Sequence, residues 1–109
     1  GQRMYVDPGQ TFVAVSYTVT ADTDLVAAVA GQKVRVLAFV ARSAAGTTSL
    51  VSSVTGTVLI GPFTVTAGNG LVLPFSEIGW GDTKVGEALK IDLSATDSNT
   101  GVLVYAYVA

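Results

Sequence analysis

At 109 residues the chain is long enough for one domain with a modest core, and its lack of cysteine and histidine excludes disulfides, thiolate metal sites and Ser/His or Cys/His nucleophile pairs. Its net charge is −2 and its six basic residues are scattered without forming a basic stripe, so no nucleic-acid partner is expected. Charged residues make up 13% of the chain, about half of the usual share of roughly 25%, so we expect other subunits or partners to cover part of its surface.

Residues 1–10 are predicted to form an irregular arm, which the turn signal Asp7-Pro8-Gly9 closes, and a single domain is expected from residue 11 to residue 109. From Phe12 to Thr20, valine and tyrosine alternate with alanine, serine and threonine, which predicts a half-buried strand. The apolar piece Leu25 to Ala30 lies between a polar turn and a glycine. It is short for a helix, so we predict a second strand there.

The segment Lys33 to Arg42 begins by alternating and then becomes apolar on both faces. This pattern is typical of a strand that is covered on both sides. The opposing sheet of the same domain would provide one cover, and a neighbouring subunit could provide the other. The longest apolar run of the chain, Val36 to Ala41, lies here and is far shorter than a membrane span, so no membrane partner is expected.

The second half of the chain contains short strands separated by glycine-containing turns. Asn69-Gly70 is a strong hairpin signal, because both central residues of a type I′ turn need a positive φ angle. We expect this turn to pair the strands on its two sides, and Pro74 to mark the end of the second one. In the first predicted strand of this half, Leu50 and Val54 share a face. The predicted strands are Thr48 to Val54, Val58 to Ile60, Phe63 to Ala67, Leu71 to Phe75, Leu89 to Ala95 and Val102 to Val108.

The chain therefore contains about eight short β-branched segments, with turns at intervals of roughly 8–12 residues and no amphipathic helix. This pattern predicts an all-β fold, an antiparallel sandwich of the jelly-roll kind.

Trp80 is the sharpest candidate for ligand binding. It lies in a long loop between Gly79 and Gly81, with Glu77 and Asp82 nearby. An exposed indole beside carboxylate acceptors is a common platform for sugars. The alternative is that the indole packs under its loop and closes one end of the sandwich, and the flanking glycines fit both interpretations.

The remaining acidic residues give weaker candidates for chemistry. Glu77, Asp82 and Glu87 share one loop region, as the two carboxylates of a glycoside hydrolase would, but we interpret them as solvated loop residues. Two pairs could offer oxygen ligands to calcium, yet turns use the same residue types to bond their own backbone. These pairs are Asp22 with Asp24 and Asp97 with Asn99. We therefore predict no catalytic residue, no metal and no cofactor.

The closing strand, Val102 to Val108, is apolar on both faces. The face with Val102, Val104 and Ala106 is apolar enough to be the core face. The other face carries two tyrosines, a residue type that is favoured at interfaces, and we predict that it contacts a neighbouring subunit. The predicted interface residues are Leu103, Tyr105, Tyr107, Leu37 and Phe39.

Four segments between residues 32 and 108 read VRVLAFVARSAAGTTSLVSS, GNGLVLPFSEIGW, GEALKIDLSA and GVLVYAYV. Together they resemble small proteins and domains of tailed bacteriophages, most specifically at Gly79-Trp80 and at Gly86-Glu87-Ala88-Leu89. The resemblance implies a trimeric jelly roll of the tumour-necrosis-factor type, used as a capsid decoration protein or as a fibre or tail module. It also implies that the last strand lies in the inner sheet, near the threefold axis. The related loops often have an aromatic residue after the tryptophan, where this chain has Gly81.

We therefore expect a non-enzymatic structural protein of the virion, a homotrimer that decorates or cements the phage head. Its expected partners are further copies of itself and the major capsid protein or another virion protein, with no nucleic acid and no cofactor. The alternative is a receptor-binding or carbohydrate-binding module of a tail fibre, in which Trp80 contacts a glycan. The expected location is the virion, at the head surface rather than on a tail fibre.

Overall fold

The computed structural model describes residues 12–43, 46–64, 70–94 and 98–109. The predicted arm at residues 1–10 and Asn69 of the predicted hairpin turn lie outside these ranges. The described residues form nine strands and no helix, so they contain no helical segment that could cross a membrane. The strands are β1 (Phe12–Val19), β2 (Thr23–Val26), β3 (Lys33–Ser43), β4 (Thr47–Ser52), β5 (Val58–Thr64), β6 (Gly70–Leu73), β7 (Gly81–Asp82), β8 (Leu89–Leu93) and β9 (Asn99–Val108).

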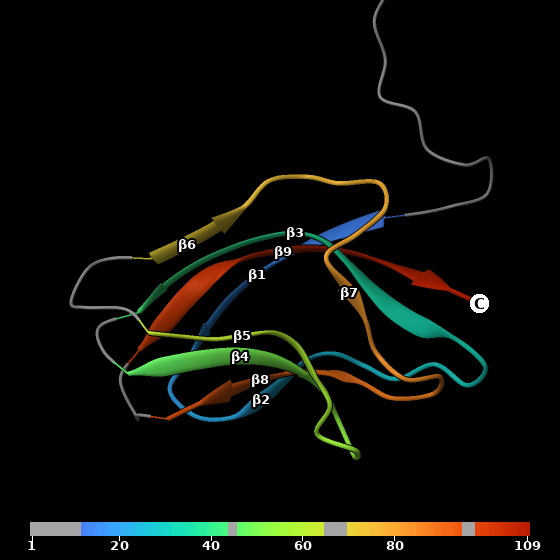
Figure 1. Ribbon diagram of the computed structural model, residues 1–109, viewed down its shortest axis with the longest axis horizontal. Coiled ribbons are helices and arrows are strands. Elements are labelled where there is room, and N and C mark those ends of the chain that lie inside the picture. The colour runs from blue at the N-terminus through green and yellow to red at the C-terminus, as the bar shows by residue number, and fades with distance from the viewer. Residues whose placement is uncertain (1–11, 44–45, 65–69, 95–97) are drawn as a thin grey trace, which may run out of the picture.

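The strands form two antiparallel sheets packed face to face (Figure 1). One sheet has the order β1-β9-β3-β6, with β7 also paired to β3, and the other has the order β2-β8-β4-β5. The all-β antiparallel sandwich that the sequence predicts is thereby confirmed. The two-residue strand β7 lies within the segment predicted as a long loop, where it extends the first sheet alongside β3.

The core lies between the two sheets and follows the alternation of the strands. Val34, Val36 and Phe39 of β3 face Leu50 of β4 and Ile91 of β8, and all five are buried in one apolar cluster. In a strand successive side chains point to opposite faces, so Leu89 and Ile91 of β8 both reach this cluster, and in β3 the alternation is interrupted once, between Val36 and Phe39. The ring of Tyr17 stacks on that of Phe39 with centroids 6.3 Å apart.

Three sequence predictions about individual strands are wrong in detail. Val58 to Ile60 and Phe63 belong to one continuous strand, β5, which passes through Gly61-Pro62. The described parts of the two strands around Asn69-Gly70 do not pair with each other as predicted, because β5 pairs with β4 in one sheet and β6 pairs with β3 in the other. β4 ends at Ser52, so Val54 does not share a strand face with Leu50 and is instead exposed in the following turn.

The predicted subunit interface is also wrong for Leu103, Phe39 and Leu37. All three side chains are fully buried within a single chain, with no exposed surface left for a neighbour. Leu103 and Phe39 belong to the core cluster. Leu37 is the extra residue where the pairing of β3 with β9 shifts register between Val36 and Ala38.

Tyr105 and Tyr107 lie on the same core side of β9 and pack against the cluster while staying half-buried. Their rings meet edge to face with centroids 5.7 Å apart, and the Tyr107 hydroxyl donates a hydrogen bond of 2.7 Å to the carbonyl oxygen of Ala27. Burial raises the pKa of Tyr107, with Tyr105 adding to the effect. The tyrosine face of β9 thus points into the sandwich, opposite to the prediction.

Candidate interaction surface

The outward side of the five-stranded sheet carries a row of valines. The strand pairing places Val72 of β6, Val40 of β3 and Val102 of β9 side by side, with Ser16 of β1 at the end of the row. The three valines are 67%, 43% and 40% exposed, respectively. Directly opposed residues on one face of a sheet have Cβ atoms about 4.5–5.5 Å apart, so these side chains form one continuous strip.

Small apolar side chains widen this strip. The next row along the strands consists of Ala38 on β3, Val104 on β9 and Ala14 on β1. None of these positions is charged. We name the two rows together the valine face, which comprises Val72, Val40, Val102, Ser16, Ala38, Val104 and Ala14.

Polar residues limit the valine face at one end. The row beyond it contains Arg42, Thr100 and Thr18, and the hydroxyl oxygens of the two threonines lie 3.3 Å apart. A shallow depression of about 360 Å³ lies between β1 and β9 at this end. Its lining residues are Ser16, Tyr17, Thr18, Thr100, Gly101 and Val102.

The segment that follows β6 covers the sheet at the other end of the valine face. In Figure 1 this segment passes over the outer side of the five-stranded sheet before it descends to β7. The backbone N–H of Ser76 donates to the carbonyl oxygen of Leu37, and that of Trp80 donates to Val36. The ring of Phe75 lies 5.6 Å from that of Phe12 on β1. One end of the outward side is therefore covered by the chain itself, and the valine face is left open.

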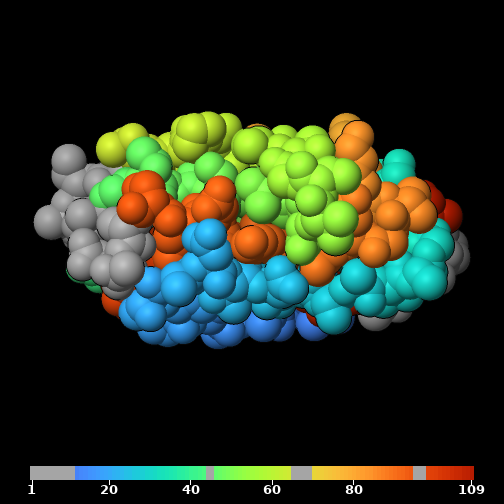
Figure 2. Space-filling view, turned by 90° about the horizontal axis from the view of Figure 1, so that it is seen from below, coloured from blue at the N-terminus to red at the C-terminus, as the bar shows by residue number. Residues whose placement is uncertain are grey.

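The outward side of the four-stranded sheet is different, because it carries charges. Asp24 of β2 pairs with Lys90 of β8, and Asp92 lies two residues further on the same side of β8. Figure 2 shows the molecule from this side, with the four-stranded sheet facing the viewer. Partial burial raises the pKa of Asp92, and the nearby Asp22 adds to the effect. Among the described residues, the two sides of the sandwich thus differ in polarity, and the five-stranded sheet carries an uncharged row of exposed valines.

Trp80 lies at the border of the segment that covers the five-stranded sheet. Its side chain is 42% exposed, and its indole N–H donates a hydrogen bond of 2.8 Å to the carbonyl oxygen of Pro74. The ring is not part of the core cluster, so it does not fill the interior of the sandwich. Ile78 and Glu77 of the same loop are exposed as well.

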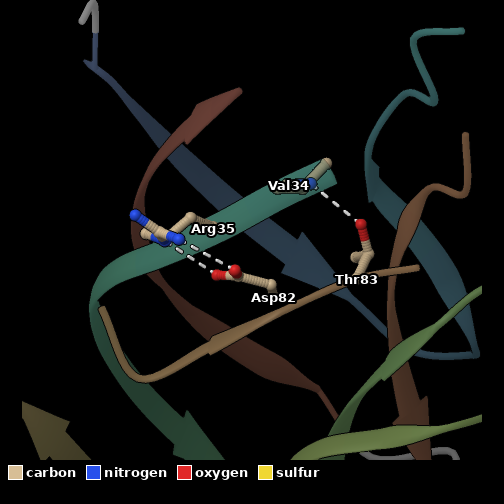
Figure 3. A network of polar contacts seen from close by, with 4 residues as sticks. All are labelled: Val34, Arg35, Asp82 and Thr83. Carbon is tan, nitrogen blue, oxygen red and sulfur yellow. Dashed lines mark hydrogen bonds and ion pairs between the residues drawn. The ribbon is translucent and has the colours of Figure 1, made fainter. Parts of the chain in front are cut away.

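Asp82 is held in an ion pair rather than free for a ligand (Figure 3). The Nε and Nη2 groups of Arg35 donate to its two carboxylate oxygens at 2.9 and 3.0 Å. This hydrogen bonding raises the pKa of Arg35. Of the three predicted ligand contacts, Trp80 and Glu77 therefore keep exposed surface, and the carboxylate of Asp82 is already bound.

Glu87 organises the turn between β4 and β5. Its Oε1 atom accepts hydrogen bonds from the Ser52 hydroxyl at 2.7 Å and from the backbone N–H and hydroxyl of Thr55 at 3.2 and 2.9 Å. The bond from Ser52 makes the largest contribution to a lowered pKa of this carboxyl. Glu87 thus has a structural role in this turn.

Two of the calcium candidates that the structure describes have partners within the protein. Asn99 is buried, where its amide bonds Tyr17 and Thr48, and Asp97 lies outside the described residues. Asp22 accepts the backbone N–H of Leu93 through Oδ1 at 2.8 Å. Within the described ranges, no three histidine, cysteine or acidic side chains gather as metal ligands would.

Sequence reasoning missed the valine face because it assigned Val102 and Val104 to the core. The signal that could have located it is the pairing of β9 with β1. Ser16 and Thr18, on the polar side of β1, stand opposite Val102 and Thr100, and opposed residues point to the same side of a sheet.

No protein-family model, curated protein or solved structure matches this chain.

Proposed function

We propose that this chain is a non-enzymatic structural protein that assembles with copies of itself through the valine face and decorates the head of a tailed phage. The observation that carries the self-assembly is the open apolar side of the five-stranded sheet, with three exposed valines in one row and no charge. Monomeric soluble proteins rarely leave large contiguous apolar patches exposed, and such patches mark interaction sites.

The strand order supports a jelly roll. Eight strands in two sheets, with the orders β1-β9-β3-β6 and β2-β8-β4-β5, interleave the first and second halves of the chain as two Greek keys do. The short strand β7 is an addition to this scheme at the side of β3. This topology is the one that the resemblance to phage decoration proteins implies.

A second copy is the partner that fits the valine face best. The face carries no charge, so two copies can meet without repulsion, and the low charge content of the whole chain points to a surface that is partly covered. Burial of apolar surface contributes roughly 25 cal/mol per Å² before the cost of association is subtracted. In the proposed trimer, each chain contributes this face to the contact with its neighbours.

Val40→Lys tests the proposed interface. A lysine in the middle of a buried apolar contact has no partner for its charge, so we expect the affinity between copies to fall by more than about tenfold, which corresponds to roughly 1.4 kcal/mol. Size-exclusion chromatography with light scattering should show an oligomer for the wild type and a smaller species for the variant.

The matched control is Val58→Lys. Val58 is 49% exposed, close to the 43% of Val40, but it lies on β5 in the other sheet. This variant should assemble as the wild type does. A monomeric wild type at micromolar concentration, or an oligomer of unchanged size and affinity in Val40→Lys, contradicts the proposed interface.

The location on the phage head rests on the resemblance and is tested separately. Cryo-electron microscopy of the phage particle that carries this chain should place it as protrusions on the outer surface of the capsid shell. Density for the chain on the tail, or its absence from the particle, would contradict the proposed role as a decoration protein.

A carbohydrate-binding module of a tail fibre is the second candidate, and the half-exposed ring of Trp80 next to the exposed Ile78 favours it. An aromatic ring that is open to solvent on one side can stack on a sugar. A glycan array with the wild type and Trp80→Ala separates the two functions. Binding that is lost in the variant supports the module, and absent or unchanged binding removes it.

A further inference from the structure

Three of the four sheet edges carry features that prevent pairing with another strand. One edge of the five-stranded sheet is formed by β6 and β7, which both pair with β3. β6 has only four residues and stops before Pro74, and β7 has two residues, one of them Asp82. In the other sheet, β2 has four residues including Asp24 and an irregular register, and β5 contains Pro62 and two register shifts. Short strands, charges, prolines and bulges are the usual means by which proteins protect their edges.

The fourth edge, β1, has none of these features. It is eight residues long, from Phe12 to Val19, contains neither charge nor proline, and pairs with β9 in unbroken register. Among the described residues no strand pairs with its other side. Alternate N–H and C=O groups of an edge strand point away from its neighbour and are free to pair with a further strand. Phe12 and Val13 at its start are exposed.

We propose that the free edge of β1 pairs antiparallel with β1 of a second copy, so that the two five-stranded sheets become one continuous sheet across a twofold axis. This inference builds on the proposed self-assembly and names a second contact for it. A twofold contact requires that a surface be complementary to itself. β1 meets this requirement, because an uncharged strand that alternates apolar and small polar residues presents the same pattern when it is reversed.

The alternation of β1 restricts the register of this pairing. Opposed residues of two antiparallel strands point to the same side of the sheet, and a shift by one residue would turn the core side outward. Val15 and Tyr17 face the core side, and Ala14 and Ser16 face outward. Of the registers that match the sides, the two with the longest overlap of Phe12–Val19 place the twofold axis either at Ser16, which then stands opposite its own copy, or at Val15, which places Ala14 opposite Ser16 of the second copy.

The edge and the valine face are separate contacts of the same sheet. In the edge pair, five strand spacings separate Val40 of one copy from Val40 of the other, roughly 24 Å at about 4.8 Å per spacing. Contact between valine faces instead brings Val40 next to the partner copy. One chain can use both contacts at once, and two contacts of different symmetry build assemblies larger than a trimer.

Single cysteines distinguish these contacts, because the natural chain has none and every disulfide must join two copies. Two samples probe the edge. Ser16→Cys alone tests the register with the axis at Ser16, and an equal mixture of Ala14→Cys and Ser16→Cys tests the register with the axis at Val15. Val40→Cys probes the valine face. Opposed residues of neighbouring strands have Cα atoms about 4.5–5.5 Å apart, within the range for a disulfide. The matched control is Val58→Cys, an exposed position on a protected edge.

After mild oxidation at micromolar concentration, one of the two edge probes should form disulfide dimers about tenfold faster than Val58→Cys, because pairing raises the effective concentration of the thiols. Edge dimers without crosslinking at Val40→Cys support the edge pair and count against the valine-face contact. Crosslinking at Val40→Cys alone overturns the edge pair and supports that contact.

No crosslinking above the control at any position overturns the edge pair. Hydrogen exchange of the wild type gives a second measurement that needs no substitution. The backbone amides of β1 that point away from β9 should exchange more slowly as the protein concentration rises. Slow exchange that is the same at every concentration means that another part of the same chain covers the edge, and it too overturns the proposal.

Discussion

Tyr17, Asn99 and Thr48 connect the two sheets through buried polar atoms. The Tyr17 hydroxyl donates a hydrogen bond of 2.7 Å to Oδ1 of Asn99, whose Nδ2 donates to the Thr48 hydroxyl at 3.0 Å. Tyr17 and Asn99 lie on paired strands of one sheet, and Thr48 lies on β4 of the other. Buried polar groups are costly when they lack partners, so this chain of bonds fixes how the sheets face each other.

Tyr17→Phe removes the first donor of this chain and leaves the Asn99 oxygen with one partner fewer. At about pH 7 we expect a loss of about 1–3 kcal/mol in the free energy of unfolding, the usual cost of an unpaired buried acceptor. Urea denaturation of the two proteins measures this difference. A variant as stable as the wild type would show that the bond contributes nothing.

The same substitution has a pH signature. Burial raises the pKa of Tyr17 above its ordinary value, so above about pH 10 the unfolded chain loses a proton that the folded chain keeps. The free energy of unfolding of the wild type should therefore fall as pH rises past this value, and the phenylalanine variant lacks this part of the loss. Urea denaturation at about pH 7 and about pH 11 should show that the difference in free energy of unfolding between the wild type and Tyr17→Phe is smaller at the higher pH. An equal difference at both pH values would contradict a raised pKa of Tyr17.

At the scale of elements, the two-residue strand β7 is held to β3 by side chains as well as by backbone. The hydroxyl of Thr83, which directly follows β7, accepts the backbone N–H of Val34 at 2.8 Å (Figure 3). The backbone N–H of Thr83 in turn donates to the Val34 carbonyl oxygen at 2.9 Å. The ion pair between Arg35 and Asp82 adds a second tie. Since Thr83 and Val34 are both buried, water cannot replace these bonds.

Thr83→Val keeps the shape of the side chain and removes the acceptor, which leaves the buried N–H of Val34 unpaired. We expect the free energy of unfolding to fall by about 1–3 kcal/mol, measured by urea denaturation. Thr83→Ser is the control, because it keeps the hydroxyl and should lose less. If serine destabilises the protein as much as valine, the methyl group and not the hydrogen bond is responsible.

At the scale of the whole molecule, the sequence predicts the strands and the fold class far better than the surfaces. β1 and β3 begin where they are predicted, because alternation and flanking turns are local signals. The prediction that the strands on the two sides of Asn69-Gly70 pair with each other is wrong, because a turn signal does not determine in which sheet the next strand lies. Trp80 could be named as a candidate from its loop, but its bond to Pro74 depends on how that loop folds.

The faces of β9 show why the candidate surface could not be predicted. One face of β9 carries Leu103 and Tyr105, and the other carries Val102 and Val104. Both faces are apolar, so hydrophobicity alone cannot say which of them is buried. Pairing with β1 over a separation of about 80 residues decides it, since Tyr17 stands opposite Gly101 and places the tyrosine side inward. The prediction that other subunits cover part of the surface rests on composition and stays a prediction. Three of the residues predicted for that contact, Leu103, Leu37 and Phe39, are fully buried within one chain.

Self-assembly through the valine face should make the stability of the fold depend on concentration. Association stabilises only the folded chain, so the temperature of unfolding rises with protein concentration by mass action. For a domain of about 100 residues, each kcal/mol shifts this temperature by roughly 4–8 °C, and we expect a rise of several degrees over an about hundredfold increase in concentration. Val40→Lys should reduce this dependence and Val58→Lys should keep it in full, as followed by circular dichroism. Equal unfolding temperatures of the wild type at all concentrations would mean that the valine face stays exposed in solution, and its three exposed valines would then need a partner other than this chain.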